Sequence, residues 1–212
     1  MTFTSISDAD VAAALEPFLL HRRLTPNQVQ QVSAYLELLM HWNARINLTA
    51  VRDPAEILTR HFGESFLLAS LLSEAASARD AVDIGSGAGF PGIPFKLLLP
   101  EPHVTLVESQ NKKATFLKEV IRKLTLINID VFTGRAENFQ QQAEIVMLRA
   151  VEQFQRVLPV AHNLVRRPGL IALLIGSGQI PAAQETLPNV GWEAPVPIPQ
   201  SRERAVLLGR IP

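Results

Sequence analysis

The sequence predicts an α/β fold built on a mostly parallel sheet of the nucleotide-binding type. A short apolar run, 80–84, breaks into a glycine-rich turn. A second apolar run, 103–107, ends at Glu108, about 20 residues after those glycines, where such folds place a carboxylate that binds a ribose. From residue 79 onward strand and helix patterns alternate, which is typical of a parallel sheet with helices on both faces.

The first third of the chain carries helical patterns and no strand pattern. Helical stretches are expected over 8–20, 25–45, 53–61 and 64–72. Thr25-Pro26 pairs a capping side chain with proline at the first helical position, and Asp53-Pro54 restarts a helix. We therefore expect residues 1–78 to form a helical extension and residues 79–212 to form the sheet domain.

The sheet domain continues with further alternating elements. Helices are expected over 91–99 and 111–124. Strands are expected over 80–84, 103–108, 128–133, 144–148, 170–175, 196–199 and 205–208. That makes about seven strands, the last two at one edge of the sheet.

The spacing of the glycines distinguishes two kinds of ligand. A dinucleotide turn follows G-x-G-x-x-G, but Phe90 stands where its third glycine belongs. The chain instead reads Asp-x-Gly-x-Gly-x-Gly, through Asp83, Gly85, Gly87 and Gly89. That form suits S-adenosylmethionine, which carries no pyrophosphate and needs no helix N-terminus directed at one. We therefore predict S-adenosylmethionine as the cofactor and disfavour a nicotinamide-dependent dehydrogenase.

The composition excludes several classes of protein and of chemistry. The 212 residues include no cysteine, so disulfides, thiolate metal sites and cysteine nucleophiles are excluded. Formal charge is balanced, with 20 basic against 20 acidic residues, which argues against a non-specific nucleic-acid coat but not against a local basic face. No secretory signal is visible at the N-terminus, and no apolar run reaches the ~18 residues of a membrane span. We expect a soluble cytoplasmic protein without a metal site.

The missing cysteine also restricts how a methyl group could be transferred. Cysteine adducts at pyrimidine carbon and radical methylation at a cysteine-bound iron–sulfur cluster are both excluded. The fourth strand ends in Leu148-Arg149-Ala150, not in the Asn/Asp-Pro-Pro-aromatic turn common in amine methylation. A ring nitrogen with a free lone pair fits best, because proximity and orientation then supply most of the rate. Arg149 is expected beside the donor, since strand ends of this kind face the ligand crevice; the alternative is a surface salt bridge.

Basic residues gather on the helix that follows Glu108. Lys112, Lys113, Lys118, Arg122 and Lys123 are opposed only by Glu119. They form either a solvated helix face or a rim that contacts phosphates, because Lys112 and Lys113 come directly after the ribose-binding position. Farther along, Ala136 and Glu137 follow the third strand, where a loop normally contacts the adenine. We interpret His41 and His61 as packing or capping residues and not as metal ligands.

Three sequence motifs together resemble one known family along nearly the whole chain. They are Asn47-Leu48-Thr49-Ala50-Val51-Arg52-Asp53-Pro54, Arg60-His61, and the run 82–94, Val-Asp-Ile-Gly-Ser-Gly-Ala-Gly-Phe-Pro-Gly-Ile-Pro. The chain is similar to the ribosomal RNA small subunit methyltransferase G family, also called the glucose-inhibited division protein B family. The resemblance implies a class I methyltransferase, Rossmann-like fold with an N-terminal helical extension. It also implies methyl transfer from S-adenosylmethionine to N7 of a guanine in 16S rRNA.

The resemblance also implies roles for individual residues and partners. The family's donor-binding residues fall on Gly85, Phe90, Ala136, Glu137 and Arg149, with Glu108 at the ribose position. Arg149 is the residue expected to orient the donor or the base during catalysis. The basic residues expected to face RNA or donor are Lys112, Lys113, Arg149 and Arg204. The expected partner is 16S rRNA or the small ribosomal subunit, and we expect a monomer because nothing indicates an obligate interface.

Three departures from the family pattern leave alternatives open. Glu108 and Glu64 stand where the family often has aspartate, and Ile175 stands where the fifth strand usually ends in lysine. Losing that cation would weaken phosphate contact by ~1 kcal/mol or more. One alternative is therefore a donor-binding, RNA-associated protein with weakened or lost catalysis. Another is a small-molecule methyltransferase, which leaves the basic helix and the extension unexplained.

Overall fold

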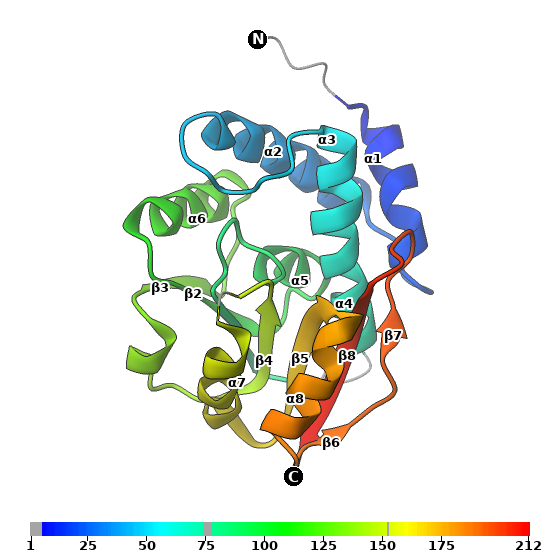
Figure 1. The fold of residues 1–212 in the computed structure, drawn as a ribbon. Coiled ribbons are helices and arrows are strands. Elements are labelled where there is room, and N and C mark those ends of the chain that lie inside the picture. The colour runs from blue at the N-terminus through cyan, green and yellow to red at the C-terminus, as the bar shows by residue number, and fades with distance from the viewer. Residues whose placement is uncertain (1–5, 74–77, 152) are drawn as a thin grey trace.

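The computed structural model describes residues 6–73, 78–151 and 153–212. Its centre is an eight-stranded sheet in the order β3-β2-β1-β4-β5-β8-β6, with β7 pairing to β8 (Figure 1). The strands are β1 (Asp80–Ile84), β2 (His103–Glu108), β3 (Ile129–Thr133), β4 (Ala143–Arg149), β5 (Val165–Gly176), β6 (Gly191–Trp192), β7 (Val196–Pro197) and β8 (Arg204–Ile211). Strands β1 to β5 run parallel, and β8 is antiparallel to β5. The predicted mostly parallel α/β sheet is confirmed.

The helices before β1 are α1 (Asp8–Leu15), η1 (Glu16–Phe18), α2 (Pro26–Asn43), α3 (Pro54–Ile57), η2 (Leu58–Gly63) and α4 (Glu64–Leu72). Those after it are α5 (Gly92–Leu98), α6 (Asn111–Lys123), η4 (Ala136–Asn138), α7 (Phe154–Asn163), η5 (Ser177–Gln179) and α8 (Ile180–Thr186). Thr25 caps α2 as predicted: its side chain accepts from the Gln28 N–H, and the Gln28 side chain accepts in return from the Thr25 N–H. The helical character of the first third is confirmed.

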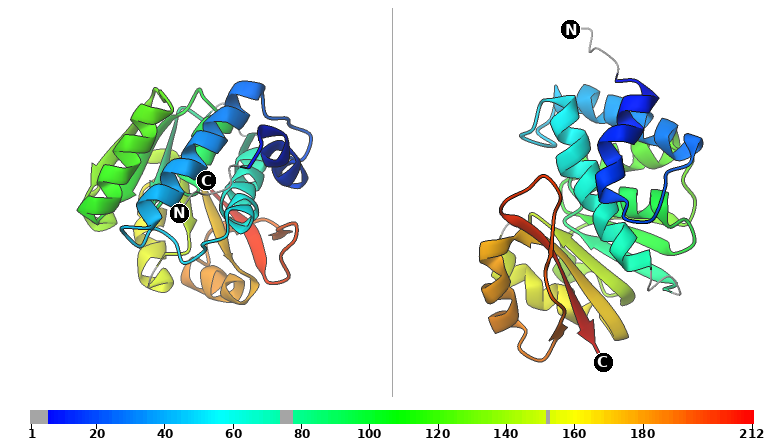
Figure 2. Two further views of the ribbon diagram at one scale, coloured as in Figure 1. Left: turned by 90° about the horizontal axis from the view of Figure 1, so that it is seen from above. Right: turned by 90° about the vertical axis from the view of Figure 1, so that its right-hand side faces the viewer.

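Two apolar clusters cover the two faces of the sheet. On β5, Leu170, Ala172 and Leu174 belong to the cluster formed with α1, α2, α4, α5 and α6. The alternating residues Ile171, Leu173 and Ile175 belong to a second cluster with α7 and α8. Figure 2 shows these two helices, yellow and orange, on the side of the sheet opposite the blue to green helices. Strand residues of period two thus bury both faces.

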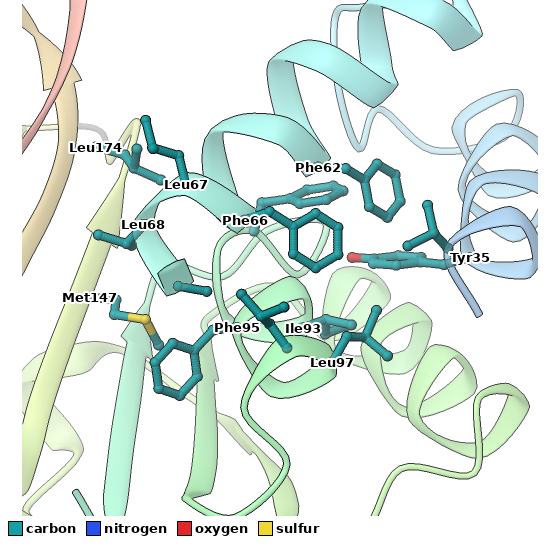
Figure 3. Close-up of a cluster of buried hydrophobic side chains, with 14 of the residues drawn as sticks. Tyr35, Phe62, Phe66, Leu67, Leu68, Ile93, Phe95, Leu97, Met147 and Leu174 are labelled. Atoms are coloured by element: carbon teal, nitrogen blue, oxygen red, sulfur yellow. The ribbon is translucent and has the colours of Figure 1, made fainter. Parts of the chain in front are cut away.

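Aromatic side chains join the helical extension to the turn that follows β1. Tyr35 of α2 stacks on Phe90, with ring centroids 5.4 Å apart, and the Phe62 ring meets Phe90 edge-on at 5.0 Å. The Tyr35 hydroxyl donates a hydrogen bond to the Ala88 carbonyl. Figure 3 shows Tyr35 and Phe62 with the buried side chains of α4 and α5. The extension and the sheet therefore share one core, and the expected boundary at residues 78 and 79 falls just before β1.

Some elements differ from the expected ones. Strand β5 begins at Val165 and not at residue 170, because the Pro168-Gly169 interruption lies within a strand whose pairing with β4 shifts register between Ala143 and Ile145. Strand β6 and the helices α7 and α8 were not predicted. Residues 54–72 form consecutive helical segments, of which η2 is a π-helix.

Substitution of Gly92 tests how closely α5 approaches the sheet. An added Cβ at this position would lie 2.7 Å from Asp83 Oδ2 and 2.9 Å from Asp83 Cβ, and would also contact Leu106 Cδ2. We expect Gly92→Ala to lower the free energy of unfolding by about 1–3 kcal/mol through overpacking, as measured by urea denaturation. Gly178→Ala is the control, since no atom lies within 4 Å of its added Cβ. Equal stability of the two variants would contradict this close packing.

Candidate functional site

A cavity of about 270 Å³ opens at the carboxyl ends of β1, β2, β3 and β4. Of the residues predicted to bind donor or RNA, those that line it are Gly85, Gly87, Glu108, Lys113, Ala136 and Glu137. Its other lining residues include Ser109, Gln110, Val151 and Val157. The cavity thus lies where an open α/β sheet binds ligands, at the carboxyl edge of its strands.

The glycine turn leaves backbone unprotected beside this cavity. Gly85, Gly87 and Gly89 adopt positive φ angles of 69°, 57° and 92°, a region that favours glycine. A Cβ added to Gly87 would have Gly85 O as its nearest neighbour, at 3.7 Å. The space over this residue is therefore open, and a ligand can approach the main chain closely.

The Glu108 carboxylate faces the glycine turn. Its Oε2 accepts a hydrogen bond from the Gly87 N–H at 2.9 Å, and its Oε1 accepts one from the Gln110 N–H at 2.7 Å. The residue is 4 % exposed. Each carboxylate oxygen has a second lone pair, so both oxygens can still accept from the hydroxyl groups of a ligand.

Three predicted residues lie under the turn and do not line the cavity. Asp83 is fully buried, and its Oδ2 accepts from the Gly92 N–H at 3.0 Å. Gly89 packs against the Tyr35 hydroxyl and Ile93, and the Phe90 ring lies in the aromatic junction with the extension. In this structure these residues support the turn from behind.

The Arg149 side chain turns toward the helical extension. Its Nη2 donates to the Arg60 carbonyl at 2.8 Å, to His61 Nδ1 at 2.9 Å and to Glu64 Oε2 at 3.1 Å. The π-helix explains the first bond, because the Glu64 N–H pairs with the carbonyls of Thr59 and His61 and bypasses that of Arg60. Arg149 does not line the 270 Å³ cavity, and its catalytic role stays a prediction.

The other predicted basic residues differ in their surroundings. Lys112 is exposed on the first turn of α6, and Lys113 lies at the cavity. Arg204 forms an ion pair with the buried carboxylate of Glu64, with Nε 2.9 Å from Oε1. Ile175 packs in the second apolar cluster and is 3 % exposed.

Sequence reasoning missed the apolar wall of the cavity. Val151 and Val157 line it, and Val157 lies on α7, which was not predicted. Phe154, Val157, Leu158 and Ala161 have the spacing of an amphipathic helix, so the signal was present. Between β4 and α7, Ala150 takes a φ of 48°, a left-handed conformation uncommon for a non-glycine residue, which local pattern does not reveal.

Two further observations concern the part of the chain that the structure describes. Within it, no group of three or more histidine or acidic side chains is arranged to hold a metal ion. None of its helices combines the length and the hydropathy needed to cross a bilayer.

The pH dependence of stability tests the burial of Asp83. Burial raises the pKa of Asp83 from 3.8 to about 7. A raised pKa in the folded state contributes stability below the ordinary pKa, and that contribution is lost as the pH rises through the folded value. The free energy of unfolding of Asp83→Asn does not show this decline, because asparagine does not titrate. We expect its free energy of unfolding, relative to wild type, to rise by about 1.4 kcal/mol per pH unit between about pH 4 and 7.

Urea denaturation at several pH values measures this difference. Glu37→Gln is the control and should follow the wild-type profile, because Glu37 is exposed and forms no ion pair or side-chain hydrogen bond with the described residues. Parallel profiles for wild type and Asp83→Asn would show that the carboxyl group titrates as it does in the unfolded chain.

Solved structures share this architecture at low sequence identity. A SAM dependent methyltransferase from Aquifex aeolicus superimposes with a TM-score of 0.57 at 14% identity, over 75% of this chain and 94% of that one. TYW2 from P. horikoshii, in complex with MeSAdo, gives 0.57 at 16% identity, over 71% of this chain and 62% of that one. The chain has the class I methyltransferase fold with a helical N-terminal part.

Sequence comparison identifies the family, whereas the solved structures identify only the fold. The GidB family model, described as rRNA small subunit methyltransferase G, matches residues 28–186. The ribosomal RNA small subunit methyltransferase G of Roseiflexus castenholzii is 37% identical, over 88% of this chain and 84% of its own length. That of Xanthomonas axonopodis pv. citri is 38% identical, over 86% and 84%. The chain therefore belongs to the rRNA small subunit methyltransferase G family.

Proposed function

We propose that this protein transfers a methyl group from S-adenosylmethionine to N7 of a guanine in 16S rRNA. The observation that carries the proposal is the cavity beside bare glycine backbone, with the Glu108 carboxylate at its edge, in a chain of this family. The helical extension is proposed to act as a cap fused to the donor domain, because Tyr35 and Phe62 pack on the donor turn.

The residues around the cavity suit each part of the donor. Glu108 would accept hydrogen bonds from the ribose hydroxyls, and the open backbone at Gly85 and Gly87 would pass close to the amino-acid portion. Ala136 and Glu137 would contact the adenine edge, with Val151 and Val157 against its ring face. When bound, S-adenosylmethionine supplies a methyl group already activated by its sulfonium.

The acceptor proposed for this chain needs no deprotonation. N7 of guanine carries a free lone pair in the neutral base, so the protein must chiefly hold that atom in line with the methyl carbon. Such a reaction needs no cysteine, and the chain has none. Arg149, at the end of β4, is proposed to orient the donor or the base.

The RNA is proposed to approach across the N-terminal end of α6. Lys112 and Lys113 lie there, and Lys118, Arg122 and Lys123 follow on the same helix. Among the described residues none of these five side chains forms an ion pair, whereas Arg204 is paired with Glu64. Unpaired basic groups are the ones free to contact phosphates. We propose a monomer acting in the cytoplasm, where ribosomal subunits are assembled.

Methylation of ribosomal particles tests the function. The protein is incubated with labelled donor and with small subunits, naked 16S rRNA or assembly intermediates that lack the modification, and N7 methylation is mapped. Incorporation at a guanine in any of the three substrates is expected. Tight donor binding without incorporation in all three would instead favour the donor-binding protein that lacks catalysis.

Substitution of Glu108 tests the donor site. In Glu108→Gln an NH2 group replaces one of the two oxygens, so one of the two backbone N–H groups loses its acceptor, and a ribose hydroxyl loses a charged partner. We expect affinity for S-adenosylhomocysteine, measured by calorimetry, to fall by about 10-fold or more. Glu108→Asp keeps the charge and should lose less. Unchanged affinity in Glu108→Gln would remove this residue from the donor site.

Substitution of Lys112 tests the RNA surface. Removing one phosphate contact should weaken rRNA binding and lower the slope of log K against log salt by up to about 1. Arg79→Ala is the matched control, because Arg79 is exposed just ahead of β1, at the opposite edge of the sheet. Filter binding over a salt series gives both slopes. Equal slopes for Lys112→Ala and Arg79→Ala would contradict this placement of the RNA.

A further inference from the structure

One buried carboxylate holds two arginines from distant strands. Glu64, at the start of α4, is 2 % exposed. Its Oε2 accepts from Arg149 Nη2 at 3.1 Å and from Arg204 Nη2 at 2.9 Å, and its Oε1 lies 2.9 Å from Arg204 Nε. Arg149 ends β4, and Arg204 begins β8. The carboxyl edge of the sheet is thus tied to the helical extension through a single acid.

His61 also binds the Arg149 side chain. A guanidinium has only donors, so His61 Nδ1, 2.9 Å from Arg149 Nη2, must be the acceptor. The proton therefore resides on Nε2, which donates to Thr49 Oγ1 at 2.7 Å. Burial and the charges of Arg149 and Arg60 lower the pKa of His61 to about 3, which keeps the imidazole neutral near pH 7.

The Asn-Leu-Thr motif anchors this arrangement from the other side. Asn43 Oδ1 accepts from the N–H groups of Leu48 and Thr49, at 2.9 and 3.0 Å. Thr49 Oγ1 also accepts from the Val51 N–H at 3.1 Å. Thr49 is thereby fixed in the loop after α2, so the histidine, and through it the arginine, has a rigid partner.

Arg149 retains unused donors. Its side chain is 10 % exposed, and its Nε is buried without a hydrogen-bond partner. All of its hydrogen bonds within the described residues run from Nη2. A buried N–H without an acceptor costs free energy. The protein thus holds the guanidinium through one nitrogen, while Nε and Nη1 form no hydrogen bond with the described residues.

We propose that Glu64 is a positioning residue for methyl transfer, acting with His61 to fix the Arg149 guanidinium at the carboxyl edge of β4. Glu64 does not contact donor or base; it acts through Arg149. The inference rests on the proposed function, in which Arg149 orients the donor or the base. It also assigns a purpose to the π-helix, which brings the Arg60 carbonyl, His61 and Glu64 to one guanidinium.

A double-mutant cycle tests the proposal with the full-length protein and unmodified small subunits. Transfer rates are measured for wild type, Glu64→Gln, Arg149→Ala and the double variant. Glu64→Gln should lower kcat/KM by about 10-fold or more, as a displaced catalytic group does. In the Arg149→Ala background the same substitution should change kcat/KM by less than about 2-fold, because its target is gone. Additive losses would overturn the proposal.

Two controls separate positioning from folding. Glu56→Gln makes the same chemical change two turns earlier, at a half-exposed carboxylate whose ion-pair partner among the described residues is Arg60, and should leave the rate unchanged. His61→Phe keeps a ring but removes the Nδ1 acceptor. We expect His61→Phe to lower kcat/KM in the wild-type background and to have little effect in the Arg149→Ala background. This second cycle carries the test if Glu64→Gln does not fold.

The outcomes also distinguish this inference from the proposed function. Thermal denaturation shows whether Glu64→Gln and His61→Phe are folded. If wild type methylates the subunits and both folded variants retain the full rate, only the positioning role fails. If wild type transfers no methyl group to any ribosomal substrate, the proposed function fails, and the role of Glu64 falls with it.

Discussion

The Glu108 carboxylate ties the glycine turn after β1 to the start of α6, because each of its oxygens accepts a backbone N–H from one of them. Without that acid the Gly87 N–H and the Gln110 N–H would face the cavity without a protein acceptor. The same two oxygens keep lone pairs for a diol. One side chain therefore shapes the cavity and is also the one proposed to bind the donor there, so the shape of the proposed site depends on this interaction.

Other contacts support the glycine turn from the side away from the cavity. Asp83 accepts the Gly92 N–H at the start of α5, and the Tyr35 hydroxyl donates to the Ala88 carbonyl. The aromatic rings of the extension then cover Phe90. The helices before β1 consequently support the turn at which the donor is proposed to bind. Through Glu64 they also contact the last residue of β4 and the first residue of β8, at the carboxyl edge of the parallel strands.

The central strands and the position of the cavity could be predicted from the sequence. The apolar runs gave the central strands, and the glycine spacing with Glu108 located the cavity, because both depend on residues close in sequence. The surroundings of Arg149 and Arg204 were out of reach. Their partner Glu64 lies 85 and 140 residues away, and such pairing depends on how α4 packs against the sheet. The π-helix that presents the Arg60 carbonyl likewise has no signature in residue spacing.

A structure of the protein bound to S-adenosylhomocysteine tests the central claim most directly. The account predicts the ribose hydroxyls within about 3 Å of the Glu108 carboxylate, the adenine beside Ala136, and the sulfur near the exposed backbone of the glycine turn. A ligand seated elsewhere, or a ribose turned away from Glu108, would contradict it.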